Sequence, residues 1–130
     1  MMHVFNLRVY YEDTDLAGIV YYANYLKFIE RARSEWVRGL GVDQSALRAQ
    51  GVVFAVRRVV ADYVRPAVFD DELQVRTQVL AATGARLTLA QTVWRGDALL
   101  FEAEVQLVCL SDAGRAVRFP AVVLAAVTVM

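Results

Sequence analysis

One segment of the sequence has the spacing of a long helix, and it constrains the fold more than any other. Between Ala23 and Gly39, apolar residues recur every three or four positions. These are Tyr25, Ile29, Ala32, Trp36 and Leu40, with Leu26, Phe28 and Val37 beside them. A narrow polar stripe lies opposite, formed by Lys27, Arg31, Ser34 and Arg38. Because apolar side chains cover most of the circumference, the rest of the protein must largely surround this helix.

The remaining sequence is typical of β-strands separated by turns. Residues 4–11 predict a first strand at a sheet edge, and residues 53–64 predict a second strand that ends at Pro66. Apolar and polar residues alternate over 73–80 and over 101–109, as in half-buried strands. Turn sequences occur at 83–85, 95–97 and 112–114. Tight turns force antiparallel pairing, so we expect a meander of about four long strands.

Two shorter segments complete the chain. Asp43 is placed to cap a short helical turn that runs to Arg48 and closes at Gly51. Residues 121–130 are compatible with a final strand, a short helix or an interface surface. The predicted class is α+β, a single domain over residues 1–130 in which a curved antiparallel sheet of five to six strands wraps one long buried helix.

Composition excludes several classes of protein. Fourteen basic and fourteen acidic residues cancel, so the chain lacks the basic excess of nucleic-acid-binding proteins. Hydrophobic residues make up 58% of the chain, yet no uncharged stretch approaches the roughly 20 residues that a membrane helix needs. The apolar surplus must therefore enter a core or a subunit interface. The N-terminus does not resemble a signal peptide, and a single cysteine permits no internal disulfide, so we expect a cytoplasmic protein.

The possible chemistry is narrowed by elimination. His3 is the only histidine and lies two residues from a terminus expected to fray, which argues against a Ser-His-Asp triad. One histidine and one cysteine cannot form an ordinary zinc site, so no metal site is predicted. Glycine-rich nucleotide-binding loops are absent from the sequence. Catalysis would have to use carboxylates, backbone N–H groups, hydroxyls or arginines.

Three carboxylates, those of Glu12, Asp13 and Asp15, lie within four residues just before the predicted helix. Crowded carboxylates raise the pKa of at least one member, which prepares a general base. The nearby helix start offers unpaired N–H groups that can polarise a carbonyl oxygen. Together these are the two parts that acyl transfer needs. The alternative is that Asp13 and Asp15 only accept backbone hydrogen bonds within the turn.

Two segments resemble a known family. The run YYEDTDLAGIVYYANYLKFIERARSEW, residues 10–36, strongly resembles the signature of the 4-hydroxybenzoyl-CoA thioesterase family. It is most similar to the Tol–Pal-associated (YbgC-like) acyl-CoA thioesterase branch. The run DYVRPAVFDDELQVRT, residues 62–77, resembles a strand–loop–strand segment of that branch.

The resemblance implies a hotdog fold and hydrolysis of an acyl-CoA thioester without a covalent serine. It implies no cofactor, because CoA is part of the substrate. Asp15 matches the catalytic carboxylate, acting as nucleophile or general base, and the Tyr22 backbone N–H matches the group that polarises the carbonyl. Gly18 matches the motif glycine that allows close backbone approach, Tyr25 the motif tyrosine, and Arg86 a contact to the CoA phosphates. Family members form dimers and usually tetramers, with each acyl pocket at a subunit interface.

Other residues have weaker claims to a function. We expect Asp13 to hold the loop, and Cys109 to pack on the apolar face of its strand. Glu30 is the alternative carboxylate should Asp15 prove inert. The charges of Arg57, Arg58 and Arg65 are expected to be solvated, whereas for Arg115 and Arg118 both roles stay open.

Two rival functions remain. One is hydration or dehydration of an acyl thioester on the same fold, for which His3 is badly placed. The other is a hotdog domain that only binds acyl-CoA or docks onto a partner.

Overall fold

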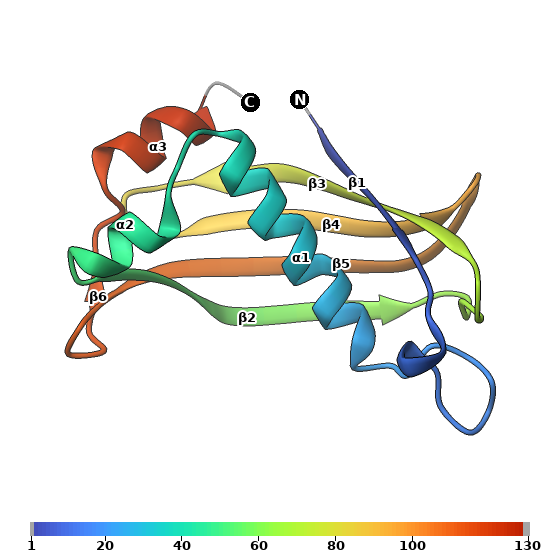
Figure 1. The fold of residues 1–130 in the computed structure, drawn as a ribbon. Helices are drawn as coiled ribbons and strands as arrows, with labels where there is room; N and C mark the ends of the chain where they lie inside the picture. Colours follow the sequence, from blue (N-terminus) through green and yellow to red (C-terminus); the bar gives the residue numbers. More distant parts are fainter. Residues whose placement is uncertain (1, 129–130) are drawn as a thin grey trace.

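A computed structural model describes residues 2–128 as a six-stranded antiparallel sheet with one long helix across a face (Figure 1). The strands are β1 (His3–Arg8), β2 (Val52–Tyr63), β3 (Glu72–Ala82), β4 (Leu87–Arg95), β5 (Ala98–Ser111) and β6 (Ala116–Val117). The helices are the 3-10 turn η1 (Tyr11–Asp13), then α1 (Asn24–Gly39), α2 (Gln44–Ala49) and α3 (Ala121–Thr128). The predicted α+β class and strand number are confirmed.

The strand order is β1-β3-β4-β5-β2, with the short β6 also pairing with β5. Only β3, β4 and β5 form a meander, so the predicted four-strand meander is wrong at β2. That strand pairs with β5, from Val52 opposite Ser111 to Tyr63 opposite Phe101, and it forms one edge of the sheet. The connection over residues 64–71 is longer than a tight turn. It therefore allows the chain to pass β5 and β4 and to enter β3, near the opposite edge of the sheet. Strand β1 forms the opposite edge, as predicted.

Helix α1 packs its apolar face on the sheet, and the core lies between them (Figure 1). Tyr25, Phe28, Ile29, Ala32, Trp36 and Val37 are buried. Leu26 is 40% exposed, so the apolar stripe is narrower than expected. The alternation predicted for β3 and β5 is confirmed, since Leu73, Val75, Phe101 and Val105 face the helix side and are buried.

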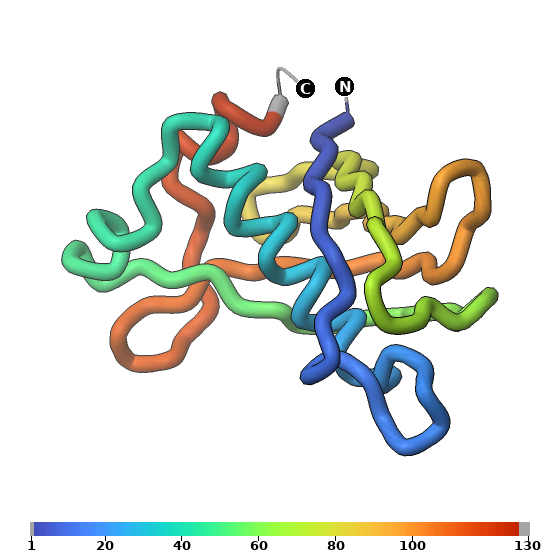
Figure 2. The backbone as a smooth tube through the Cα atoms, turned by 45° about the vertical axis from the view of Figure 1, so that its right-hand side comes forward, coloured from blue at the N-terminus to red at the C-terminus, as the bar shows by residue number. Residues whose placement is uncertain are grey.

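Two loops meet at one end of the sheet, where residues 9–22 lie against residues 64–71 (Figure 2). The first strand is shorter than expected, because η1 begins at Tyr11. The two loops are joined by backbone bonds, including Val20 N–H to the Ala67 carbonyl at 2.8 Å and Asp70 N–H to the Val9 carbonyl at 2.9 Å. This end carries the predicted site residues that precede α1.

The opposite end carries α2, α3 and β6 (Figure 1). Asp43 caps α2 as predicted, because its side chain accepts a hydrogen bond from the Ala46 N–H at 3.1 Å. The C-terminal segment forms a helix over Ala121–Thr128, while residues 129 and 130 of the predicted segment lie outside the described residues. His3 is not frayed as expected, since it lies within β1 opposite Thr77. Over residues 2–128, none of the helices combines the length and apolarity needed to cross a membrane.

Candidate functional site

Asp15 opens a four-residue turn that ends at Gly18. The Gly18 N–H donates to the Asp15 carbonyl at 2.9 Å, and Asp15 Oδ1 accepts from the Ala17 N–H at 2.9 Å. Gly18 has φ +81°, a left-handed conformation that costs other residues free energy. A Cβ at Gly18 would meet no atom within 4 Å, so within this chain the positive φ explains the glycine better than close packing does. The turn leaves the Asp15 carboxylate exposed to solvent.

Asp13, two residues earlier, has the opposite environment. It is 5% exposed, and both of its carboxylate oxygens accept hydrogen bonds. Oδ1 accepts from Asn24 Nδ2 at 2.9 Å, and Oδ2 accepts from the Tyr10 N–H at 2.8 Å. These bonds agree with the expectation that Asp13 holds the loop. Of the three carboxylates in the acidic segment, that of Asp13 is therefore buried, whereas Glu12 and Asp15 are exposed.

Helix α1 begins without a capping side chain. Ala23 occupies the N-cap position, and no side-chain oxygen accepts from the first turn there. The Tyr21 carbonyl accepts from the Asn24 N–H at 2.8 Å. Because the Tyr21–Tyr22 peptide is planar and trans, the Tyr22 N–H points the opposite way, out of the helix. No acceptor within residues 2–128 bonds this N–H, so it is available to a ligand.

A pocket of about 240 Å³ brings Asp15 and Tyr22 together. It is lined by Asp15, Ile19, Val20, Tyr21, Tyr22, Tyr25, Tyr63, Arg65 and Pro66. The predicted residue Tyr25 belongs to this lining, whereas Gly18 and Arg86 do not. The pocket therefore combines the exposed Asp15 carboxylate, the unpaired Tyr22 N–H and a wall that contains four tyrosines. A carboxylate beside a free N–H at a helix start is an arrangement that can polarise and attack a carbonyl group.

Tyr25 is the buried tyrosine of the pocket lining. Its ring stacks on Phe101, with centroids 4.9 Å apart and planes 10° apart. Its hydroxyl oxygen accepts from the Ala67 N–H at 3.0 Å and so ties the 64–71 loop to α1. Burial raises the pKa of Tyr25, which keeps the phenol protonated at neutral pH and leaves its own proton free to donate.

Among the lining residues that the sequence reasoning did not predict, Tyr63 and Arg65 bring polar groups from a distant segment of the chain. Tyr63 ends β2, and its hydroxyl donates to the Tyr22 carbonyl at 3.0 Å. Arg65 was expected to be a solvated strand charge, but it follows the strand and lines the pocket although its side chain is exposed. Both residues lie in residues 62–77, the second segment that resembles the family. That resemblance was the sequence signal that could have identified them as site residues.

Arg86 lies far from this pocket within the chain. It sits in the turn between β3 and β4, and the guanidinium of Arg118 lies against Gly84 of the same turn. Val93, the β4 residue opposite Phe101, is seven positions further along, a separation of roughly 23 Å along an extended strand. The structure therefore does not bring Arg86 to Asp15, although it places Arg118 at the same turn as Arg86.

The other nucleophilic or acidic candidates also lie outside the pocket. Glu30 accepts a hydrogen bond from Ser34 Oγ at 3.0 Å on α1. Cys109 is fully buried, and burial raises the pKa of its thiol, as fits the expected packing role. Within residues 2–128, no three His, Cys, Asp or Glu side chains gather as a metal site would require.

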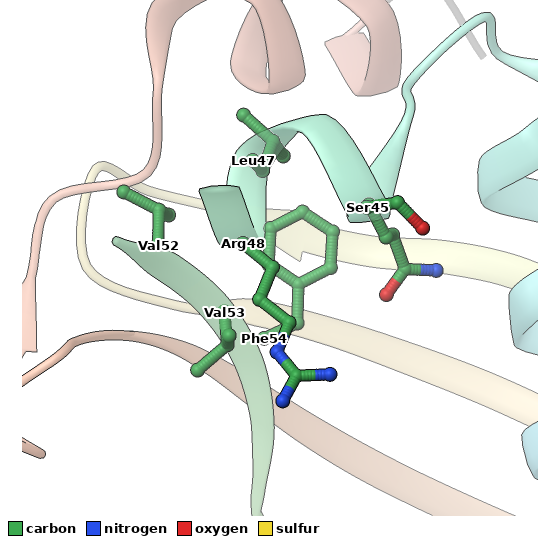
Figure 3. Close-up of a pocket in the computed structure, with 7 residues that line it drawn as sticks. Ser45, Leu47, Arg48, Val52, Val53 and Phe54 are labelled. Carbon is green, nitrogen blue, oxygen red and sulfur yellow. The ribbon is translucent and has the colours of Figure 1, made fainter. Parts of the chain in front are cut away.

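A separate depression of about 520 Å³ lies between α2 and the start of β2 (Figure 3). Arg48 extends along it from α2, next to Val53 and Phe54 of β2. Its lining contains one cation and no carboxylate, so it lacks the group that thioester hydrolysis would need.

Comparison with known proteins identifies the family to which the chain is similar. The family model described as "Thioesterase-like superfamily" matches residues 9–127. The acyl-CoA thioesterase YbgC of Haemophilus influenzae is 42% identical over 125 residues, which cover 94% of this chain and 91% of that protein. The acyl-CoA thioester hydrolase YbgC of Escherichia coli O157:H7 is 44% identical over 105 residues, 80% of this chain and 78% of that protein. A probable thioesterase from Bartonella henselae, known from its crystal structure, is 36% identical, with a TM-score of 0.88 and coverage of 92% and 100%.

Proposed function

The chain belongs to the thioesterase-like superfamily and has the hotdog fold, and from this premise we propose that it hydrolyses an acyl-CoA thioester to a free acid and CoA. The observation that carries the proposal is the presence of the exposed Asp15 carboxylate and the unpaired Tyr22 N–H in one pocket. The named relatives, which are acyl-CoA thioesterases, support CoA as the carrier of the acyl group.

In the proposed reaction the Tyr22 N–H donates to the thioester oxygen, which gains negative charge as the carbonyl carbon becomes tetrahedral. Asp15 either attacks that carbon directly or removes a proton from the water that attacks it. The C–S bond then breaks, and CoA leaves as the thiol after protonation. In the first route water hydrolyses the resulting anhydride, so both routes consume one water. The proposal needs no cofactor, because CoA is part of the substrate.

The small, aromatic pocket supports short-chain or aromatic acyl groups as substrates. Its volume is about 240 Å³, below the range of drug-sized ligand sites. The rings of Tyr22, Tyr25 and Tyr63 offer apolar contact to the acyl group. Gly18 would contribute by letting the turn present Asp15, rather than by direct contact.

We also propose that a second copy of the chain completes the site, in a dimer or tetramer. Strand β2 forms a twelve-residue edge that pairs only with β5 within residues 2–128. Val53, Val56, Val59 and Val60 of this strand are each more than a third exposed. A long apolar edge of this kind is normally covered in a native protein. In such an assembly Arg86 would serve a pocket of another subunit, where it would contact CoA phosphates.

The test measures free-thiol release from a panel of acyl-CoA substrates, with Asp15→Asn as the variant. We expect turnover of a short or aromatic acyl-CoA, and a loss on the order of 100- to 10,000-fold in Asp15→Asn, with melting temperature and oligomer size unchanged. An active Asp15→Asn protein would remove Asp15 from the mechanism. Binding of acyl-CoA without thiol release by the wild-type protein would favour the non-catalytic alternative.

A further inference from the structure

The carbonyl group of Tyr22 is held from outside the helix. In a regular α-helix this carbonyl would accept from the N–H four residues later, on Leu26. Here the Leu26 N–H donates to the Ala23 carbonyl instead, at 3.1 Å. The Tyr22 carbonyl accepts from the hydroxyl of Tyr63 at 3.0 Å, a residue 41 positions away at the end of β2. The segment that leads into α1 is therefore anchored to the sheet at Tyr22, two residues before the helix begins.

Both peptide groups that flank Tyr22 are consequently fixed. The preceding peptide is held through the Tyr21 carbonyl, which accepts from the Asn24 N–H at 2.8 Å. The following peptide is held through the Tyr22 carbonyl by Tyr63. With both peptide planes held, the backbone angles of Tyr22 have little freedom, and so the direction of its N–H is set. No capping side chain contributes to this, because the N-cap residue is Ala23.

The Tyr63 ring is itself well supported. It makes edge-to-face contacts with Phe101 at 5.1 Å, Tyr25 at 5.6 Å and Tyr22 at 6.1 Å between centroids. The next residue, Val64, donates its N–H to the Leu100 carbonyl at 2.8 Å, which extends the pairing of β2 with β5. Desolvation raises the pKa of Tyr63, so its hydroxyl stays protonated and remains a donor around neutral pH.

We propose that Tyr63 is a positioning residue for thioester hydrolysis: its hydroxyl, by holding the Tyr22 carbonyl, keeps the Tyr22 N–H directed at the carbonyl oxygen of the substrate. This inference rests on the proposed function. The Tyr63 hydroxyl acts through the backbone of Tyr22 and takes no part in bond making or breaking. Removal of the Tyr63 hydroxyl leaves the contacts of the ring with the substrate in place. The direction of the Tyr22 N–H is then no longer fixed.

The first experiment compares Tyr63→Phe with Tyr11→Phe. Tyr11→Phe is the matched control, because the Tyr11 ring contacts Phe69 and its residue does not line the pocket. Its hydroxyl makes no hydrogen bond within residues 2–128. We expect Tyr63→Phe to lower kcat by roughly 10- to 100-fold with little change in KM, and Tyr11→Phe to leave both unchanged. Full kcat in Tyr63→Phe, or a rise in KM with kcat retained, would overturn the proposal.

A second measurement follows the donor directly. Acyl-CoA labelled with ¹³C at the carbonyl is bound to Asp15→Asn, and the carbonyl stretch is recorded by difference infrared spectroscopy. We expect a frequency lowered by the Tyr22 hydrogen bond, and a return toward the value in water when Tyr63→Phe is added. An unchanged frequency in the double variant would contradict the positioning role. Thiol release by the wild-type protein separates either result from failure of the proposed function itself.

Discussion

The carboxylate of Asp13 accepts a hydrogen bond from the side-chain amide of Asn24 at 2.9 Å, and both residues are buried. This bond joins the acidic loop to the first turn of α1. The Asn24 N–H in turn holds the Tyr21 carbonyl, so one residue connects Asp13 with the peptide that carries the Tyr22 N–H. The loop of Asp15 and the start of the helix therefore form one unit.

Replacing Asp13 should destabilise the protein, whereas replacing Asp15 should not. Asp13→Ala leaves the Asn24 amide and the Tyr10 N–H without their acceptor, and we expect the free energy of unfolding to fall by about 2–4 kcal/mol. Asp15→Asn should remain within about 0.5 kcal/mol of the wild-type protein, since its carboxylate is exposed. Urea denaturation measures both. A double-mutant cycle with Asn24→Ala should show coupling, and its absence would argue against the bond.

Gly18→Ala should strain the Asp15 turn. A Cβ at φ +81° costs on the order of 1 kcal/mol, although no neighbouring atom blocks it. Because the strain falls on the turn that presents Asp15, we expect kcat for acyl-CoA hydrolysis to drop as well. Gly39→Ala is the control, since that glycine lies in α1 without a positive φ and with open space around it. Equal stability and activity in both variants would show that the turn tolerates a side chain.

Gln91→Ala should lower stability without a specific effect on catalysis. Gln91 is fully buried beneath α1, where its Nε2 donates to the Ile29 carbonyl and to Thr77 Oγ1, and its Oε1 accepts from Arg33, each at 2.9 Å. Loss of this network leaves the half-buried Arg33 without its acceptor, at a cost of about 2–4 kcal/mol. Gln78→Ala on the exposed face of β3 is the comparison, measured by urea denaturation. A Gln91→Ala protein as stable as Gln78→Ala would refute the network's importance.

Cys109 should be unreactive until the protein unfolds. A thiol reagent such as 5,5′-dithiobis(2-nitrobenzoate) at pH 8 should label no cysteine in the native protein and one per chain in guanidinium. Burial raises the pKa of the folded thiol above its unfolded value, so its stabilising contribution is complete below the unfolded pKa and is lost as pH rises through the folded pKa. The stability difference between wild type and Cys109→Ala should therefore shrink above about pH 9. Rapid native labelling would contradict the buried position.

The sequence alone was sufficient to predict the helices and strands that are specified by the spacing of nearby residues. The spacing of Tyr25, Ile29, Ala32 and Trp36 predicted α1, and alternation predicted β3 and β5, because helix and strand periods bring residues of one face together over a few positions. The motif that precedes α1 singled out Asp15 and Tyr22. Both lie in one pocket, since only seven positions and one turn separate them.

The tertiary structure alone decided which distant residues meet. Strand β2 pairs with β5 rather than with its sequence neighbour β3, and no local pattern specifies a strand's partner when the connection is long. That pairing carries Tyr63 to the carbonyl of Tyr22 and Arg65 to the rim of the pocket. Arg86, in the turn between β3 and β4, stays at the far end of the sheet. Long-range contacts of this kind depend on how the sheet closes around α1, which involves every strand at once.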